Sequence, residues 1–407
     1  MNYFAELGLS DRLAARLAEI GLTDPTPIQS KAIPRVLEGR DLMGLAQTGT
    51  GKTAAFGLPL IQMLNSVGEK PAPKSARALI LAPTRELARQ ITEALQSFIG
   101  KSHLKVAMVV GGASLNAQAS RLLRGTDILV ATPGRLIDLL DRRAVTLSET
   151  RHLVLDEADQ MLDMGFIHAL RQIVKLLPTE RQTLLFSATM PKLMAEIADA
   201  YLTDPVRVQA APPGKTADKV TQELHFVDKG EKVGLLKTML AAHRGERAIV
   251  FSRTKHGAER LMKSLTAAGF DAGSIHGNKS QGQRDRALDG FREGKLTVLV
   301  ATDVAARGID IPEVRVVYNF DLPNVPETYV HRIGRTARAG ADGKAVAFCG
   351  QDEVKELRAI EKVLGQRLHV AGGTPWMGHV AEEDKRGGAR RPQRNRRRGP
   401  PRQRKAA

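Results

Sequence analysis

A glycine-rich stretch from Ala46 to Thr53 has the residue types and spacing of a phosphate-binding loop. It follows a short apolar run, Leu42–Leu45, and precedes a helix-like run, Ala54–Leu64. Strand, glycine loop and helix is the order that such a loop requires, because the loop then brings a phosphate to the positive end of the helix. We therefore expect the phosphates of a nucleotide to bind here. A plain Gly/Thr-rich turn before a helix is the alternative.

Each residue type in this loop has a physical task. Gly49 and Gly51 lack a Cβ, so the backbone can turn tightly and bring its N–H groups close to a phosphate. Lys52 would reach the β- and γ-phosphates, and Thr53 would offer its hydroxyl to Mg²⁺. Ala46 stands where the general pattern has its first glycine.

Two adjacent acids, Asp156 and Glu157, follow the apolar run His152–Leu155. A phosphate loop needs a carboxylate for the metal and a group that activates water. We expect Asp156 to hold the metal and Glu157 to polarise the attacking water. Adjacent acids on most protein surfaces are only solvated, and this alternative stays open on the residues alone.

The length of 407 residues predicts two or three domains of ordinary size, and a hydrophobic content of 42% can fill their cores. No run approaches the roughly 18 apolar residues of a membrane span, and no signal peptide is visible at the N-terminus. Cys349 is the only cysteine, which excludes an intramolecular disulfide and a cysteine-based zinc cluster. We expect a cytoplasmic location and no membrane partner.

The net charge of +17 indicates a polyanionic partner, and much of it lies at the C-terminal end. Lys385–Ala407 holds eleven Lys and Arg residues and no acid. This stretch cannot bury enough apolar surface to offset the entropy lost on ordering. We assign residues 371–407 to a disordered basic tail and expect Trp376 to pack at the end of the preceding domain.

Apolar runs alternate with helix-like segments along the rest of the chain, which predicts parallel sheets covered by helices on both faces. A Pro/Gly/Ala-rich stretch, Gln209–Thr216, reads as a linker between two such units. We expect domains at residues 1–208 and 219–370, joined by a linker at 209–218. The expected strands after the phosphate loop are Arg77–Ala82, Val106–Val110, Asp127–Ala131, His152–Asp156 and Gln182–Ser187, then Gln222–Val227, Ala248–Ser252, Asp271–Ile275, Thr297–Ala301, Arg315–Phe320 and Lys344–Cys349.

The residues Asp156-Glu157-Ala158-Asp159 spell the signature of the DEAD-box RNA helicases of superfamily 2, and residues 4 to 370 resemble that family. Ala46 is normal for its motif I. The resemblance implies an α/β fold with two tandem RecA-like domains, and the Arg-Thr-Ala-Arg form of motif VI, the short flanks and the basic tail look most like bacterial RhlE-type members. Segments similar to the Q motif and to motifs I, Ia, Ib, III, IV, V and VI occur in the family's order: Pro25–Gln29, Ala46–Thr53, Pro83–Leu87, Thr132–Arg135, Ser187–Thr189, Val250–Thr254, Thr302–Asp310 and His331–Arg338.

The resemblance implies ATP and Mg²⁺ as cofactors and assigns roles by position. Gln29 would read the adenine edge, because a carboxamide can donate and accept at once. Phe4 would stack near the base, and Asp310 would bind the ribose hydroxyls. The implied phosphate-binding residues are Ala46, Gln47, Thr48, Gly49, Thr50, Gly51, Lys52 and Thr53, with Thr53 and Asp156 at the metal. The implied catalytic residues are Lys52, Glu157 and the arginine fingers Arg335 and Arg338.

Two further groups of residues take their roles from the same resemblance. Asp159, Ser187, Thr189 and His331 would couple the nucleotide site to the interface between the domains. The residues expected to line a groove for the RNA backbone are Arg85, Gly112, Thr132, Arg135, Arg253, Gln281, Arg284 and Thr302.

We therefore expect a monomeric, ATP-dependent RNA helicase with RNA-stimulated ATP hydrolysis, which unwinds short duplexes or remodels RNA–protein complexes. Contacts to phosphates and 2′-hydroxyls carry little sequence information, so the RNA partner would be structured or duplex RNA of any sequence. Ribosomal precursors and the RNA-degradation machinery are the partners we consider. Two alternatives are an RNA-annealing chaperone dominated by the tail, which the set Lys52, Glu157, Arg335 and Arg338 counts against, and a duplex-DNA translocase, which Gln29 counts against.

Overall fold

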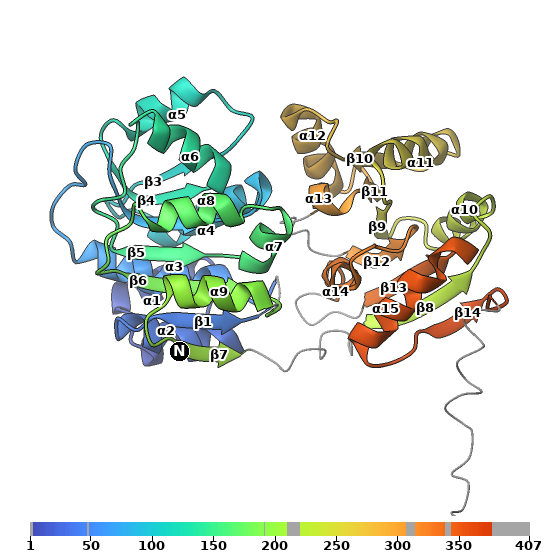
Figure 1. Ribbon diagram of the computed structural model, residues 1–407, viewed down its shortest axis with the longest axis horizontal. Coiled ribbons are helices and arrows are strands. Elements are labelled where there is room, and N and C mark those ends of the chain that lie inside the picture. The colour runs from blue at the N-terminus through green and yellow to red at the C-terminus, as the bar shows by residue number, and fades with distance from the viewer. Residues whose placement is uncertain are drawn as a thin grey trace, which may run out of the picture.

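The computed structural model describes residues 3–46, 49–190, 192–209, 220–306, 314–337 and 343–376. They form two seven-stranded sheets, each belonging to one unit (Figure 1). The first unit runs from blue to green and the second from yellow to red, and the two lie side by side. Every strand pair in both sheets is parallel, which confirms the predicted α/β class.

The strands of the first sheet are, in spatial order, β3 (Val106–Val109), β4 (Thr126–Ala131), β2 (Ala76–Leu81), β5 (His152–Leu155), β6 (Gln182–Ser187), β1 (Leu42–Leu45) and β7 (Val206–Gln209). The helices of this unit are η1 (Ala5–Leu7), α1 (Asp11–Glu19), α2 (Pro27–Leu37), α3 (Lys52–Asn65), α4 (Arg85–Ile99), α5 (Leu115–Leu122), α6 (Pro133–Asp141), α7 (Ala158–Asp163), α8 (Ile167–Val174) and α9 (Lys192–Tyr201).

Apolar residues on both faces of each strand produce two cores in this unit. In β2, Ala78 and Ile80 pack into one core and Leu79 and Leu81 into the other, because successive side chains of a strand point to opposite faces. Helices α1 to α4 cover the first face, and α5 to α9 cover the second. This double burial explains why the strands read as continuous apolar runs in the sequence.

The strands of the second sheet are, in spatial order, β10 (Ala272–Ile275), β11 (Val298–Ala301), β9 (Arg247–Phe251), β12 (Val314–Asn319), β13 (Gly343–Cys349), β8 (Val220–Phe226) and β14 (His369–Gly372). Helices α10 and α11 cover one face, and α12 to α15 cover the other. Their bounds are α10 (Lys232–Ala242), α11 (Lys255–Ala267), α12 (Gln281–Arg292), α13 (Asp303–Ala306), α14 (Pro326–Ile333), η3 (Gln351–Glu353) and α15 (Val354–Leu364).

The sheets extend further than the sequence pattern predicts at two places. Strand β7 pairs with β1 up to Gln209, the first residue assigned to the linker. Strand β14 pairs with β8 up to Gly372, so Ala371 and Gly372 lie in the second sheet and not in a disordered tail. Both are edge strands whose residues are mostly half-buried or exposed, so neither forms the continuous apolar run of a doubly buried strand.

Trp376 packs at the end of the second unit, as predicted. Its ring meets that of Phe226 edge to face at a centroid distance of 6.5 Å, and its Nε1 donates to the carbonyl oxygen of Cys349 at 3.1 Å. The linker residues 210–219 and the tail residues 377–407 lie outside the described part of the chain. Among the described helices, none combines the length and apolar character needed to cross a bilayer.

Candidate functional site

The phosphate loop connects the carboxyl end of β1 to the first residue of α3. Gly49 and Gly51 have φ angles of 84° and 90°, a left-handed conformation that favours glycine. A Cβ built on Gly51 would lie 2.3 Å from Nε2 of Gln29, so a side chain is also sterically excluded there. The sequence therefore specifies this backbone through its glycines. Gln47 and Thr48 lie outside the described residues.

Lys52, the first residue of α3, is a buried cation below this loop. Its side chain is 5% exposed, and its Nζ lies 3.5 Å from Oδ1 of Asp156. Burial alone lowers the pKa of an ammonium, but the carboxylates of Asp156, Glu157 and Asp159 outweigh burial, so the pKa of Lys52 is raised. Within the described part of the chain Nζ has no hydrogen-bond partner. A buried, charged ammonium with unused donors fits a phosphate group of a bound nucleotide.

Asp156 and Glu157 follow β5 directly, and each is 2% exposed. Oδ1 of Asp156 accepts a hydrogen bond from the backbone N–H of Glu157 at 3.0 Å. Glu157 has a φ of 52°, a left-handed conformation that costs a non-glycine residue on the order of 1–3 kcal/mol. This strained turn sets the direction of the Glu157 side chain at the N-terminus of α7.

The residues present also fit a magnesium ion bound together with a nucleotide. Mg²⁺ in nucleotide sites takes one or two protein oxygens and completes its shell with substrate phosphates and water. Asp156 is a carboxylate at the loop, and Thr53 follows Lys52 at the start of α3. The described residues contain no group of three or more His, Cys, Asp or Glu side chains placed to hold a metal. An ion here would therefore depend on the nucleotide for most of its ligands.

Gln29 ties helix α2 to the phosphate loop. Its Oε1 accepts from the backbone N–H of Thr26 at 2.8 Å, and its Nε2 donates to the carbonyl oxygen of Gly51 at 3.0 Å. The hydroxyl of Thr26 donates to the carbonyl oxygen of Thr50 at 2.8 Å. Gln29 thus holds the loop, in addition to the base-reading role expected from the sequence. Phe4 is 1% exposed and packs into the core, so stacking on a base would require its ring to be uncovered.

Asp159 is the centre of a hydrogen-bonded cluster that reaches the second unit. Its Oδ2 accepts from the backbone N–H groups of Ala188 and Thr189 at 3.1 and 2.9 Å and from the Thr189 hydroxyl at 2.9 Å. The Ser187 hydroxyl donates to the carbonyl oxygen of Thr189 at 2.6 Å. His331, on α14 of the second unit, has its Nε2 3.9 Å from the same Oδ2. The four residues expected to couple the units are therefore brought together.

Two arginines near the end of α14 have different surroundings in the structure. Arg335, just past its end, is 5% exposed and lies with His331 beside a small hollow. Arg332 is 1% exposed and makes a bidentate pair with Asp303, with N···O distances of 2.5 and 2.8 Å. Its guanidinium also lies 5.0 Å from the centroid of the Phe251 ring. Arg332 thus fixes α14 against α13, while Arg338 and Asp310 lie outside the described residues.

A groove of about 340 Å³ runs between the two units. Nη1 of Arg85 donates to Oε1 of Gln281 at 3.0 Å, and Nη2 of Arg284 pairs with Oε1 of Glu86 at 3.0 Å, so both contacts cross from one unit to the other. Burial lowers the pKa of Arg85, the Glu86 carboxylate opposes this decrease, and the nearby Arg284 and Arg135 lower the pKa further. The groove therefore concentrates positive charge, which a polyanion would relieve.

Most of the residues predicted to contact RNA line this groove or touch it. Thr132 and Arg135 line it with Arg85, Gln281 and Arg284. Gly112 lies beneath Arg85: its φ is 77°, and a Cβ there would lie 2.0 Å from Nη1 of that arginine. Three predicted residues, Gly112, Arg253 and Thr302, are not among the residues that line the groove, although Gly112 lies against Arg85. The backbone N–H of Thr302, just before α13, donates to the carbonyl oxygen of Ile275, and Arg253 lines a separate cavity in the second unit.

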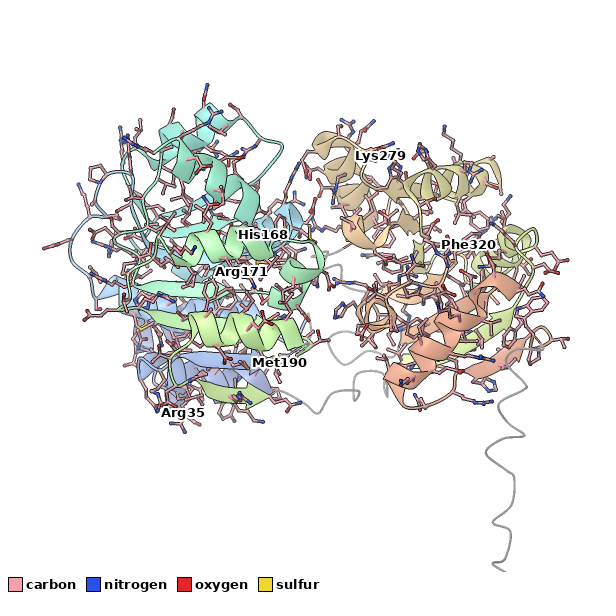
Figure 2. All side chains as sticks on the ribbon, in the orientation of Figure 1. Arg35, His168, Arg171, Met190, Lys279 and Phe320 are labelled. Atoms are coloured by element: carbon pink, nitrogen blue, oxygen red, sulfur yellow. The ribbon has the colours of Figure 1, made fainter. Side chains whose placement is uncertain are left out.

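Three residues that the sequence analysis did not single out belong to these sites. Glu86 and Lys279 line the groove, and Figure 2 labels Lys279 on the second unit. Oε2 of Glu259 holds the Lys279 ammonium at 2.8 Å. Arg332 positions α14. Glu86 and Lys279 stand beside predicted groove residues in the sequence, but only the packing of the units shows that they face the same space.

Comparisons with known proteins cover both units. A model of the DEAD/DEAH box helicase family matches residues 26–197, and a model of the helicase conserved C-terminal domain matches residues 231–340. The ATP-dependent RNA helicase CshA of Listeria monocytogenes is 44% identical over 376 residues, covering 92% of this chain and 71% of that protein. RNA helicase CrhR of Synechocystis is 46% identical over 368 residues, covering 90% of this chain and 74% of that protein. The structure of S. cerevisiae Dbp5 bound to RNA and ADP BeF3 is 31% identical with a TM-score of 0.82, covering 94% of this chain and 98% of that one.

Proposed function

Because the chain belongs to the DEAD-box family and is an ATP-dependent RNA helicase with two RecA-like domains, we propose that ATP is hydrolysed between these domains as they close on RNA. The observation that supports this most directly is the pairing of Lys52 with Asp156 under the phosphate loop, because Asp159, three residues after Asp156, faces His331 of the second domain. The nucleotide site and the domain interface are thus one connected structure.

At the nucleotide, each residue acts through the contact that its position allows. The N–H groups of the glycine loop and the Lys52 ammonium hold the phosphates, and Gln29 reads the adenine edge while it keeps Gly51 in place. Thr53 and Asp156 would hold Mg²⁺, whose chemistry is to neutralise charge on the phosphate oxygens. The proposed site is completed by Phe4 at the base, Gln47 and Thr48 at the phosphates, and Asp310 at the ribose.

Hydrolysis requires a positioned water and a cation at the γ-phosphate. The Glu157 carboxylate, fixed by its strained turn, orients the water and accepts its proton. Arg335 and Arg338 arrive from the second domain when the cleft closes, so hydrolysis depends on closure. Asp159, Ser187, Thr189 and His331 transmit that closure, because they link the acid pair to α14.

The groove between the domains holds the RNA backbone in this proposal. Arg85, Arg135, Gln281 and Arg284 meet phosphates, and Thr132 and Gly112 shape the wall. Arg284 and Gln281 presently pair with Glu86 and Arg85, so an RNA strand would exchange these contacts for phosphate contacts. Arg253 and Thr302 would extend the same surface on the second domain. If the groove holds only one RNA strand, binding of that strand displaces its partner, and short duplexes are unwound.

Several finer features complete the proposal. The Arg-Thr-Ala-Arg form of motif VI and the basic stretch Lys385–Ala407 support an RhlE-type member, whereas the relatives above carry the names CshA and CrhR. We also propose a cytoplasmic, monomeric protein, and the single cysteine supports the cytoplasmic location. The large positive charge supports a role on ribosomal precursors or with the RNA-degradation machinery.

The deciding experiment is an ATPase assay with no nucleic acid, with structured RNA and with duplex DNA, run beside a duplex-unwinding assay. We expect RNA to stimulate hydrolysis strongly, DNA to do so weakly, and Lys52→Ala to abolish both activities. Strand annealing without ATP turnover would favour an RNA chaperone, and stronger stimulation by DNA would favour a translocase.

A further inference from the structure

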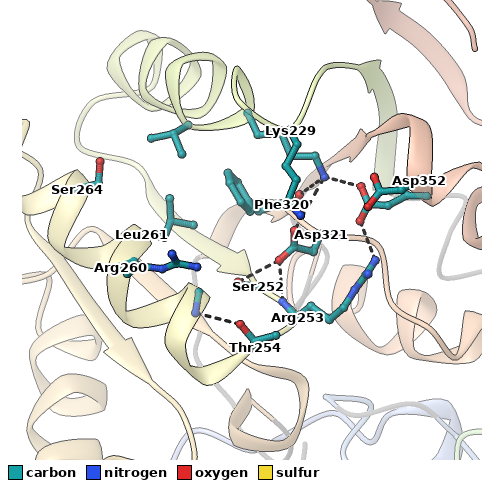
Figure 3. A pocket seen from close by; sticks show the side chains of 14 residues that line it. Lys229, Ser252, Arg253, Thr254, Arg260, Leu261, Ser264, Phe320, Asp321 and Asp352 are labelled. Atoms are coloured by element: carbon teal, nitrogen blue, oxygen red, sulfur yellow. Dashed lines mark hydrogen bonds and ion pairs between the residues drawn. The ribbon is translucent and has the colours of Figure 1, made fainter.

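A cavity of about 520 Å³ lies within the second domain, outside the interdomain groove (Figure 3). Helices α10 and α11 form its walls, and the loops after β9, β12 and β13 form its floor. All of its lining residues belong to this one domain, so the cavity does not depend on closure of the cleft. Figure 3 shows the side chains of Arg260, Leu261 and Ser264 on one side and Phe320 between them and Lys229.

The cavity combines an apolar patch with a charged rim. Phe320 is half-buried and lies with Leu261 and Val233 along the wall. The Lys232 ammonium lies 5.7 Å from the centroid of the Phe320 ring. Lys229 and Arg260 are exposed at the rim. An aromatic ring bordered by cations can bind a nucleotide, because the base stacks on the ring and the cations attract the phosphate.

The charges on the floor are already paired. Glu353 holds Lys232 through Oε2 at 2.5 Å and Arg253 through Oε1 at 2.8 Å. Asp321 accepts from the Ser252 hydroxyl at 3.0 Å and from the backbone N–H of Arg253 at 2.8 Å.

The rim differs from the floor. Within the described part of the chain, Lys229 and Arg260 take part in no ion pair, and Asp352 is the exposed acid that shares the rim with them. The rim therefore has positive charge left for a ligand.

The cavity opens at the same edge of the sheet as the domain's share of the groove. Groove residues follow β10 and β11, and cavity residues follow β9, β12 and β13, in the spatial order β10-β11-β9-β12-β13. At about 4.8 Å between strands, the two sites are separated by roughly 10 Å along the edge. About three nucleotides of stacked strand, at roughly 3.4 Å each, span that distance.

We propose that this cavity is a subsite for a nucleotide of the RNA strand beyond the interdomain groove, with its base against Phe320 and its phosphate at Lys229 and Arg260. The inference rests on the proposed RNA groove and extends its footprint. The chain's own basic stretch, Lys385–Ala407, is not a suitable occupant, because its eleven cations would meet a positive rim. The paired floor leaves stacking and phosphate binding as the available contacts.

The test measures binding of single-stranded RNA to the full chain with a non-hydrolysable ATP analogue, using oligonucleotides of about 6 and about 12 nucleotides. The variant is Lys229→Ala/Arg260→Ala. The matched control is Lys263→Ala/Lys355→Ala, which removes two exposed lysines from α11 and α15 that do not line the cavity. Arg284→Ala serves as the groove variant. All variants keep the basic stretch Lys385–Ala407, so its contribution to RNA binding is the same in each of them.

We expect the cavity variant to bind the long RNA more weakly, with a salt slope lower by about 0.7, since the subsite holds one phosphate and each phosphate contact on a single strand contributes about 0.7. The short RNA and the control variant should be unchanged. A 2-aminopurine placed beyond the groove should be quenched in the long RNA, and Phe320→Leu should remove that quenching.

Equal effects on both RNA lengths, or no effect on either, would overturn the proposal. Binding of an acidic peptide to the wild type but not to the cavity variant, with RNA binding unchanged, would assign the cavity to a protein segment instead. Arg284→Ala should weaken the binding of both RNAs. If it does not, the proposed role of the groove in RNA binding is contradicted, whatever the comparison between the two RNA lengths shows.

Discussion

Nε2 of His331, on α14 of the second domain, lies 3.9 Å from Oδ2 of Asp159, on α7 of the first. Burial lowers the pKa of His331, with Asp159 opposing and Arg335 adding to the decrease, so the imidazole is neutral near pH 7. The same carboxylate oxygen accepts three hydrogen bonds from Ala188 and Thr189. The Asp159 carboxylate thus holds the loop after β6 against α7 and faces His331 of the opposite domain.

His331→Ala is expected to lower the RNA-stimulated kcat by about tenfold, within the 1–3 kcal/mol typical of coupling between sites. ATP affinity without RNA should stay near the wild-type value, because the histidine touches the first domain only across the interface. Steady-state ATPase at saturating RNA, beside nucleotide binding without RNA, checks both parts. His103→Ala, at an exposed histidine far along the chain, is the control. An equal loss of ATP affinity would count against a coupling role.

Glu157→Gln is expected to bind ATP and RNA but to hydrolyse ATP at least about 100-fold more slowly, since general-base catalysis contributes about 10²–10⁴. The loop, Lys52 and Asp156 keep their contacts in this variant, and glutamine can adopt the same backbone. RNA should therefore dissociate more slowly in ATP. Single-turnover hydrolysis and RNA off-rates measure the two effects. Near-normal turnover would refute the assigned role.

Gln29→Ala is expected to weaken ATP binding and to relax the preference for ATP over GTP, because its amide holds Gly51 and, in the proposed site, reads the base. The preference should fall by about 1–3 kcal/mol, the value of one paired donor and acceptor contact. Gln29→Glu is the sharper variant: it keeps an acceptor for Thr26 but cannot donate to the Gly51 carbonyl. The ratio of kcat/KM for the two nucleotides decides, and an unchanged ratio in both variants would exclude base reading by Gln29.

Arg332→Lys is expected to destabilise the second domain by about 2–4 kcal/mol. Lysine keeps the charge but cannot reproduce the two-pronged pair with Asp303 or the contact with Asn319, and charge-assisted hydrogen bonds are worth about 1.5–3 kcal/mol each. Denaturant unfolding gives the free energy. Arg35→Lys, whose pair with Glu38 is exposed on α2, should change it by less than about 0.5 kcal/mol. Similar losses of unfolding free energy in Arg332→Lys and Arg35→Lys would contradict the structural role of Arg332.

Removal of Lys385–Ala407 is expected to weaken RNA binding and to reduce its salt dependence, while kcat at saturating RNA is preserved. If about half of the eleven cations engage, the slope of log K against log salt should fall by about 4, at roughly 0.7 per phosphate. The loss should be similar for RNAs of different sequence, because the stretch has no side chain that reads bases. Lines of equal slope for the two proteins would mean that the tail does not touch RNA.

The sequence by itself determined the parts that are local in the chain. The glycines of the phosphate loop, the acids after β5 and the alternation of strands and helices are recognisable because each depends on neighbours within a few residues. Doubly buried strands produce apolar runs, and left-handed turns favour glycine. The edge strands β7 and β14 escaped detection because most of their residues stay partly exposed, so neither forms a continuous apolar run.

Only the tertiary structure decided which distant residues share a space. It placed Arg85 against Gln281 and Glu86 against Arg284, set Arg253 apart in its own cavity, and turned Arg332 inward while Arg335 lies beside His331. Each of these arginines has the same chemistry in the sequence, so their roles depend on the carboxylates that the fold brings to them. The pairing of Arg85 with Gln281 joins residues 196 positions apart, and no local pattern encodes it.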